Sequence, residues 1–123
     1  MLSIDEVKAL LDDIADEVPE SFYRELNGGI ILLPDVKAHP QSKEDSDLYI
    51  LGEYHHEHRG LGRYITIYYG SFMRLYSGLS PSNLRTKLKD VLLHEFTHHI
   101  ESLAGVRSLE IKDALDIQRY RGE

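Results

Sequence analysis

Apolar side chains recur at helical spacing at the start of the chain. They stand at positions Ile4, Val7, Leu11, Ile14 and Val18. Spacing of three and four residues places such side chains on one face of a helix, so we expect an amphipathic helix over residues 3–18. Ser3 and Glu6 form an S-x-x-E capping box, which marks where this helix begins. Pro19 then opens a second short helix, which we expect the glycines at 28 and 29 to end.

The middle of the chain changes to short apolar runs rich in β-branched and aromatic residues, which are typical of strands. The predicted strands cover residues 30–34, 48–55 and 63–70. Gly52 interrupts the second strand and indicates a bulge there. The polar segment 37–47 predicts a loop, and segment 56–62 predicts a turn. Residues 71–78 predict a helical turn.

A long helix is predicted over residues 81–104. Ser80 is placed to act as its N-cap, and Pro81 occupies the first helical position, where proline is favoured. Gly105 follows as the expected C′ residue, at which the chain leaves the helix. A final helix is predicted over residues 108–120.

The order of these elements, α, α, β, β, β, α, α, predicts an α+β fold with a small, mostly antiparallel sheet. The chain has 123 residues, which suits one domain over positions 1–123. Its composition, 41% hydrophobic and 28% charged, is that of a globular protein with a core of its own. The absence of cysteine excludes a disulfide framework and any zinc site built on thiolates.

The net charge of the chain and its distribution exclude some classes of binding partner. The formal net charge is −7, and residues 1–26 hold eight acids and two bases. There is no basic stripe of the kind that phosphate contact needs, so we expect no nucleic-acid partner. No apolar run approaches the ~20 residues of a membrane span, and the first residues lack the basic and apolar regions of a signal peptide. We therefore expect a cytoplasmic protein without a membrane partner.

Chemistry is concentrated in the long predicted helix, where His94, Glu95 and His98 have the spacing HExxH. Residues i and i+4 share a helix face, so the two imidazoles can reach a common point and hold Zn²⁺ there. Glu95 lies about 100° around the helix from His94, beside the metal rather than on it. It can take a proton from a metal-bound water, whose pKa zinc lowers to about 7. The motif predicts a hydrolytic zinc centre with Glu95 as the general base.

The third metal ligand is less directly indicated. Catalytic zinc usually takes three protein ligands and keeps one position for water. Glu101 shares the histidine face but stands about 10 Å along the axis from His94. The first acids after the expected chain reversal at Gly105 are Glu110 and Asp113. We favour Glu110 as the third ligand, with Asp113 as the alternative.

Glu95 and His99 also stand four residues apart, so they form an alternative pair of metal ligands on the same helix. An apolar stripe runs along the helix through Leu88, Leu92, Phe96, Ile100 and Leu103. His99 lies at the edge of this stripe, which favours a hydrogen-bonded, half-buried histidine over a ligand. Asp90 and Glu101 stand one turn before and after the HExxH histidines, where each is either an orienting carboxylate or a surface charge.

The run GRYITIYYGSF followed by LLHEFTHHIESLAGVRSLEIKDA resembles the small bacterial zincin-like metallopeptidase family. The resemblance covers roughly residues 47–120 and rests on HExxHH after a β-rich ITIYYGSF segment. It implies a compact minimal zincin fold, with the metal helix packed under a short sheet. Many members carry HExxHxxGxxD, in which the Asp is the third ligand. Here Gly105 comes seven residues after His98, and position 108 is Ser108.

The resemblance also implies that residues 64–69 form an edge strand beside the cleft, where a peptide can add as a further strand. Tyr68 or Tyr69 would then donate to the oxyanion of the reaction intermediate, although sheet packing is the favoured interpretation of each. A second group of histidines stands next to a turn, at His55, His56 and His58. A solvated turn is favoured for this group over a second metal site or a His55 that overhangs the cleft.

The sequence thus predicts a zinc-dependent metallopeptidase that cleaves peptides or unfolded proteins. His94, His98 and Glu110 hold the zinc ion, and Glu95 is the general base. The first alternative is a non-catalytic zinc-binding module that binds partners, for example through its acidic first helix. The second is a module without metal, in which the histidines are pH-sensitive polar contacts.

Overall fold

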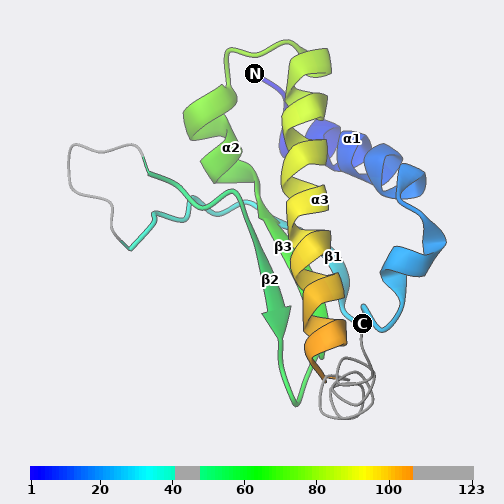
Figure 1. The fold of residues 1–123 in the computed structure, drawn as a ribbon. Helices are drawn as coiled ribbons and strands as arrows, with labels where there is room; N and C mark the ends of the chain where they lie inside the picture. The colour runs from blue at the N-terminus through cyan, green and yellow to red at the C-terminus, as the bar shows by residue number, and fades with distance from the viewer. Residues whose placement is uncertain (41–47, 107–123) are drawn as a thin grey trace, which may run out of the picture.

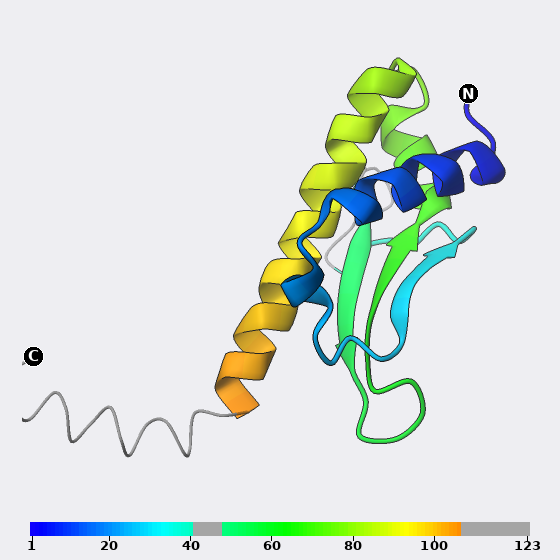
Figure 2. The same cartoon turned by 90° about the vertical axis from the view of Figure 1, so that its right-hand side faces the viewer.

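The computed structural model describes residues 1–40 and 48–106, which form the layered arrangement of Figure 1. In chain order the elements are α1 (Ile4–Glu17), the 3-10 helix η1 (Glu20–Tyr23), β1 (Gly29–Leu33), β2 (Gly52–His56), β3 (Arg63–Tyr68), α2 (Tyr69–Tyr76) and α3 (Pro81–Val106). Figure 2 shows α1 and α3 packed on the same side of the sheet. The predicted α+β class is confirmed. The final helix predicted over residues 108–120 lies outside the described residues.

The first helix forms as its sequence predicts. The Ser3 hydroxyl accepts from the backbone N–H of Glu6 at 3.1 Å, and the Glu6 carboxylate accepts from the backbone N–H of Ser3 at 3.0 Å. This reciprocal pair is the capping box, and it satisfies two backbone donors that a helix start leaves open. The buried face of α1 carries Val7, Leu11 and Ile14 into the core.

The sheet is mixed rather than mostly antiparallel. Its strand order is β1-β3-β2, with β1 parallel to β3 and β2 antiparallel to β3. The β3 strand is therefore central, and its last residues, from Ile65 to Tyr68, are buried. The prediction that the segment 64–69 forms an edge strand is wrong, because both edges of β3 are paired. The strand that ends the sheet on the side of α3 is β2.

Two glycines show how closely the layers approach. The predicted bulge at Gly52 is absent, because Gly52 is the first regular residue of β2 and pairs with Ile67. A Cβ atom at Gly52 would lie 2.9 Å from Cγ1 of Val91 on α3. Only a residue without a side chain allows the strand and the helix to come this close. The strand predicted over residues 48–55 is correspondingly shorter, with an isolated bridge between Ala38 and Tyr49 before it.

Gly70 is the tighter of the two positions, and its replacement should destabilise the fold. A Cβ atom there would lie 2.6 to 2.7 Å from Val36 Cγ2 and from the carbonyl oxygens of Pro34 and Asp35. Backbone atoms cannot move aside cheaply, so we expect Gly70→Ala to lower the free energy of unfolding by about 1–3 kcal/mol. Urea unfolding measures the change. Gly78→Ala is the matched control, because a Cβ atom at Gly78 meets nothing within 4 Å.

The long helix α3 supplies much of the core through one face. Its fully buried apolar residues are Leu84, Leu88, Leu92 and Phe96. Phe96 packs edge-on against Tyr23 with 5.1 Å between ring centroids. Ile100, predicted to continue this stripe, is 42% exposed. The helix also runs through Gly105 to Val106, so the prediction that Gly105 is the C′ residue is wrong.

No helix within residues 1–40 and 48–106 is long and apolar enough to cross a membrane.

Candidate metal centre

His94 and His98 converge on one point beside α3. Their Nε2 atoms lie 3.1 Å apart, and their ring centroids are 4.7 Å apart. Zinc–nitrogen bonds of 2.0–2.1 Å in a tetrahedral site separate two ligand nitrogens by about 3.4 Å. The two imidazoles therefore stand within a few tenths of an ångström of the spacing that a shared zinc ion requires. Both residues are exposed and both line the same pocket.

Glu95 lies on the sheet-facing side of α3. It is adjacent to His94 in the sequence, but it is buried whereas His94 and His98 are exposed. Only 6% of the residue is accessible to solvent. Burial raises the pKa of the Glu95 carboxyl, and the neighbouring His94 and His98 act in the opposite direction. A carboxylate in this position is shielded from bulk water but still faces the space above the two imidazoles, because all three side chains line one pocket.

That pocket, of about 800 Å³, opens between α3 and β2. Its walls are His94, Glu95, His98, Glu101 and Ser102 from α3, Gly52, Glu53, Tyr54 and His56 from β2, and His39 and Ile50 from the segment before β2. Since β2 ends the sheet, the pocket runs along an edge strand. A second hollow of about 400 Å³ shares five lining residues with the first: His39, Ile50, Gly52, His94 and Glu95. The site is therefore an extended surface groove rather than a closed cavity.

The third ligand predicted from the sequence is not placed by the structure. Glu110 and its alternative Asp113 both lie outside the described residues. Among residues 1–40 and 48–106, no group of three His, Cys, Asp or Glu side chains is arranged to hold a metal. Glu101 lines the pocket without joining such a group. In the same described residues, neither Asp90 nor Glu101 hydrogen-bonds to an imidazole of the pair, and both are exposed.

His99 is hydrogen-bonded, as predicted, and it is more deeply buried than predicted, with no accessible surface. Its Nε2 lies 2.8 Å from the carbonyl oxygen of Arg24, and its Nδ1 lies 2.8 Å from the Tyr54 hydroxyl. Because a carbonyl oxygen only accepts, Nε2 carries the proton. Burial lowers the pKa of His99. Both ring nitrogens are thus engaged, which leaves His94 and His98 as the converging pair.

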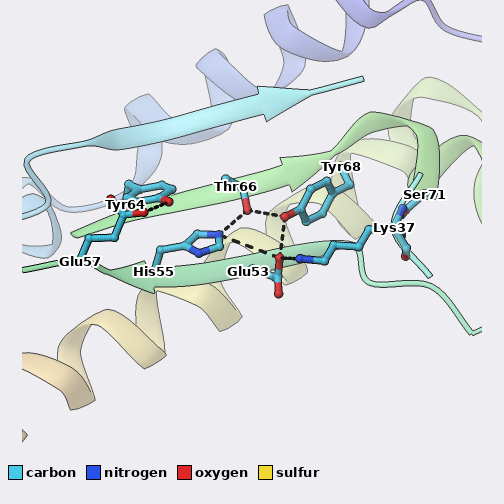
Figure 3. A network of polar contacts seen from close by, with 8 residues as sticks. All are labelled: Lys37, Glu53, His55, Glu57, Tyr64, Thr66, Tyr68 and Ser71. Carbon is cyan, nitrogen blue, oxygen red and sulfur yellow. Dashed lines mark hydrogen bonds and ion pairs between the residues drawn. The ribbon is translucent and has the colours of Figure 1, made fainter. Parts of the chain in front are cut away.

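Neither of the two tyrosines considered as oxyanion donors lines the pocket, and both hydroxyls are engaged elsewhere in the fold. Tyr68 Oη donates to the Glu53 carboxylate at 2.5 Å, and Tyr69 Oη donates to the carbonyl oxygen of Leu2 at 2.6 Å. Figure 3 shows Tyr68 and Glu53 in a polar network on the sheet that also includes Lys37. Burial raises the pKa of Glu53, but the hydrogen bonds from Lys37 and Tyr68 outweigh it and hold the pKa low. The tyrosine that does line the pocket is Tyr54.

The second group of histidines divides between two surfaces. His55 hydrogen-bonds to Thr66 Oγ1 at 2.9 Å and stacks on the Tyr64 ring, as Figure 3 shows, and it does not line the pocket. His56 does line the pocket, and its ring centroid is 5.2 Å from that of His58. Sequence reasoning did not place His56 or Tyr54 in this pocket, because alternation along β2 alone does not reveal which face meets α3, and no motif marks His39 or Ser102.

The fold and this groove define a small α+β protein whose long helix presents two converging histidines and a buried carboxylate beside an edge strand. No protein-family model and no curated protein matches the chain. The chain is similar to the solved structure of a conserved hypothetical protein from Thermus thermophilus, with 33% sequence identity and a TM-score of 0.69. The match covers 84% of this chain and 98% of the other. The chain belongs to the same family as that protein.

Proposed function

We propose that this protein is a zinc-dependent metallopeptidase. The observation that carries the proposal is the 3.1 Å approach of the His94 and His98 Nε2 atoms above a groove whose wall contains the buried Glu95. This is the relation that a metal-assisted hydrolysis needs: two ligands on one helix face, and a carboxylate beside them that is not itself a ligand. The resemblance to zincin-like metallopeptidases points to the same activity.

The donor set suits zinc. Two imidazoles with a carboxylate form a site of the type that zinc hydrolases use, and softer metals prefer thiolates, which this chain lacks. His94 and His98 would supply the nitrogens, and we propose Glu110 as the carboxylate. The two imidazole nitrogens already lie within hydrogen-bond distance of each other on α3, so binding of the ion would need only small shifts of these side chains.

Zinc, when bound, lowers the pKa of a coordinated water and polarises the carbonyl of the scissile bond. Glu95 accepts a proton from the attacking water and passes it to the nitrogen of the leaving amine. Its burial in the groove wall fixes the carboxylate and excludes competing solvent contacts. An extended peptide can lie along β2, whose outer edge pairs with no other strand within residues 1–40 and 48–106. Peptides and unfolded segments fit this open groove.

Metal content tests the proposal first. Full-length protein, prepared without an affinity tag or chelator, should contain about one zinc per chain by elemental analysis. His94→Ala and His98→Ala should each reduce zinc affinity by more than the 10–100-fold typical of losing an outer-shell partner. His58→Ala is the histidine control, because His58 is exposed and does not line the groove. Wild-type protein that stays free of zinc after zinc is supplied would refute the metal centre.

The same affinity measurement assigns the third ligand. The zinc affinity of the Glu110→Ala variant should be well below that of the Asp113→Ala variant. The opposite order would transfer the role to Asp113.

A further inference from the structure

Arg63, the first residue of β3, is a buried cation that does not line the groove but hydrogen-bonds to residues in its wall. The residue is only 7% exposed, and within residues 1–40 and 48–106 it forms no ion pair with a carboxylate. Its Nη1 donates to Tyr54 Oη at 2.9 Å and to Ser102 Oγ. Tyr54 and Ser102 are both groove-lining residues. Since no carboxylate of the described residues compensates the Arg63 charge, its positive potential can act on a ligand that binds beside Tyr54 and Ser102.

Of the two hydroxyls that accept from Arg63 Nη1, those of Tyr54 and Ser102, only that of Ser102 has no second partner among the described residues. The Tyr54 hydroxyl accepts from Arg63 and engages Nδ1 of His99, so it is used on both sides. The Ser102 oxygen accepts from Arg63, and in the described part of the chain its own proton has no acceptor. Other hydroxyls on α3 behave differently: Thr86 and Thr97 donate back to the carbonyl one turn earlier. Ser102 is therefore a hydroxyl donor backed by a cation.

We propose that the groove beside Tyr54 and Ser102 binds a carboxylate of the substrate, with Ser102 donating to it and Arg63 supplying the charge. The inference rests on the proposed peptidase function and adds a substrate class. Ser102 follows His98 by four residues, which is about 6 Å along the helix axis. An extended peptide advances about 3.3–3.6 Å per residue. The carboxylate then stands one or two residues from the scissile bond, as the chain-terminal carboxylate or as an acidic side chain.

Three acidic side chains line the groove, Glu53, Glu95 and Glu101, and Glu95 is replaced by glutamine in the test below. Glu53 is held by Lys37, so its charge is compensated. Glu101 opposes an incoming carboxylate, but it is exposed at the rim, where water screens it. His56 also lines the groove and adds no negative charge.

The test compares three blocked tripeptides by calorimetry on the zinc-loaded Glu95→Gln variant, in which binding is measured without turnover. They are acetyl-Leu-Ala-Ala as the free acid, the same peptide as the C-terminal amide, and acetyl-Leu-Ala-Glu-amide. A hydrogen bond to a charged group predicts at least about tenfold tighter binding of a carboxylate peptide than of the neutral amide. Preference for the free acid alone identifies the chain-terminal carboxylate, and preference for the glutamate peptide alone identifies the side chain. Equal binding of all three, or binding of none, overturns the inference.

Substitutions identify the residues that cause the preference for a carboxylate peptide. Ser102→Ala, a mild change on a half-buried helix position, should remove most of it, and Arg63→Met should abolish it while Arg63→Lys retains part. Thr86→Ala is the control, because it removes an exposed hydroxyl of α3 outside the groove. A preference unchanged in both Ser102→Ala and Arg63→Met would also overturn the inference. Hydrolysis of the neutral amide peptide by wild-type protein reports on the peptidase function separately, so the two proposals can fail independently.

Discussion

Glu95→Gln should keep about one zinc per chain and lower kcat for peptide hydrolysis by about 10²–10⁴-fold, the usual contribution of a positioned general base. Glutamine has the shape of glutamate and can still hydrogen-bond to the water, but it cannot take its proton. Because Glu95 is buried and is not a proposed ligand, the substitution should leave the convergence of His94 and His98 unchanged. Zinc content and steady-state kinetics on one peptide, measured side by side, give both quantities.

The control for this experiment is Glu20→Gln, which makes the same chemical change at an exposed position outside the groove and should leave kcat within error. Full activity in Glu95→Gln would remove Glu95 from the mechanism. A wild-type protein that binds zinc tightly but cleaves no peptide would instead favour the alternative of a non-catalytic zinc-binding module. In that case four protein ligands and no bound water are expected.

Phe96→Ala should lower the free energy of unfolding by about 3–5 kcal/mol, the range for removing a buried aromatic ring. Phe96 is fully buried and contacts the rings of Phe22 and Tyr23, so it joins α3 to the segment after α1. Its removal leaves a cavity between α3 and that segment. Urea unfolding followed by circular dichroism measures the loss, which for a domain of this size is a large share of its stability.

Ile100→Ala is the matched control, one turn further along the same helix. Since Ile100 is 42% exposed, the change should stay within about 0.5 kcal/mol. The sequence assigns both residues to one apolar stripe, whereas the structure separates them. Comparable losses at the two positions would mean that another surface covers Ile100 in solution.

The contrast between Phe96 and Ile100 shows where sequence reasoning succeeds and where it stops. Helix starts are local, so the capping box at Ser3 and the proline at Pro81 place α1 and α3 correctly. Periodicity also identifies the face of α3 that becomes buried, but not the point where the surface packed against that face ends. Gly105 is a comparable case, because glycine is permitted inside a helix as well as at its end, and only the conformation of the chain decides between them.

The neighbours of a strand depend on contacts between residues that are distant in the sequence. For this reason the sequence wrongly predicted that residues 64–69 form an edge strand. The run YITIYY carries no charged side chain on either face, which is typical of a strand covered on both sides, and that pattern could have indicated that β3 is central. For the candidate centre, the spacing of HExxH was sufficient to predict that His94 and His98 converge. The burial of His99 was out of reach, because its partners Tyr54 and Arg24 lie 45 and 75 residues away in the chain.

The position of β2 at the end of the sheet has a consequence for colloidal behaviour. Unpaired backbone groups on an edge strand are open to any extended chain, including the same strand of a second molecule, and long flat edges are sites of aggregation. β2 has only five residues, and Glu53, His55 and His56 make it polar, while α3 stands close beside it. A short, polar edge beside a helix is a poor template for repeated strand pairing, so the features of β2 disfavour aggregation through this edge.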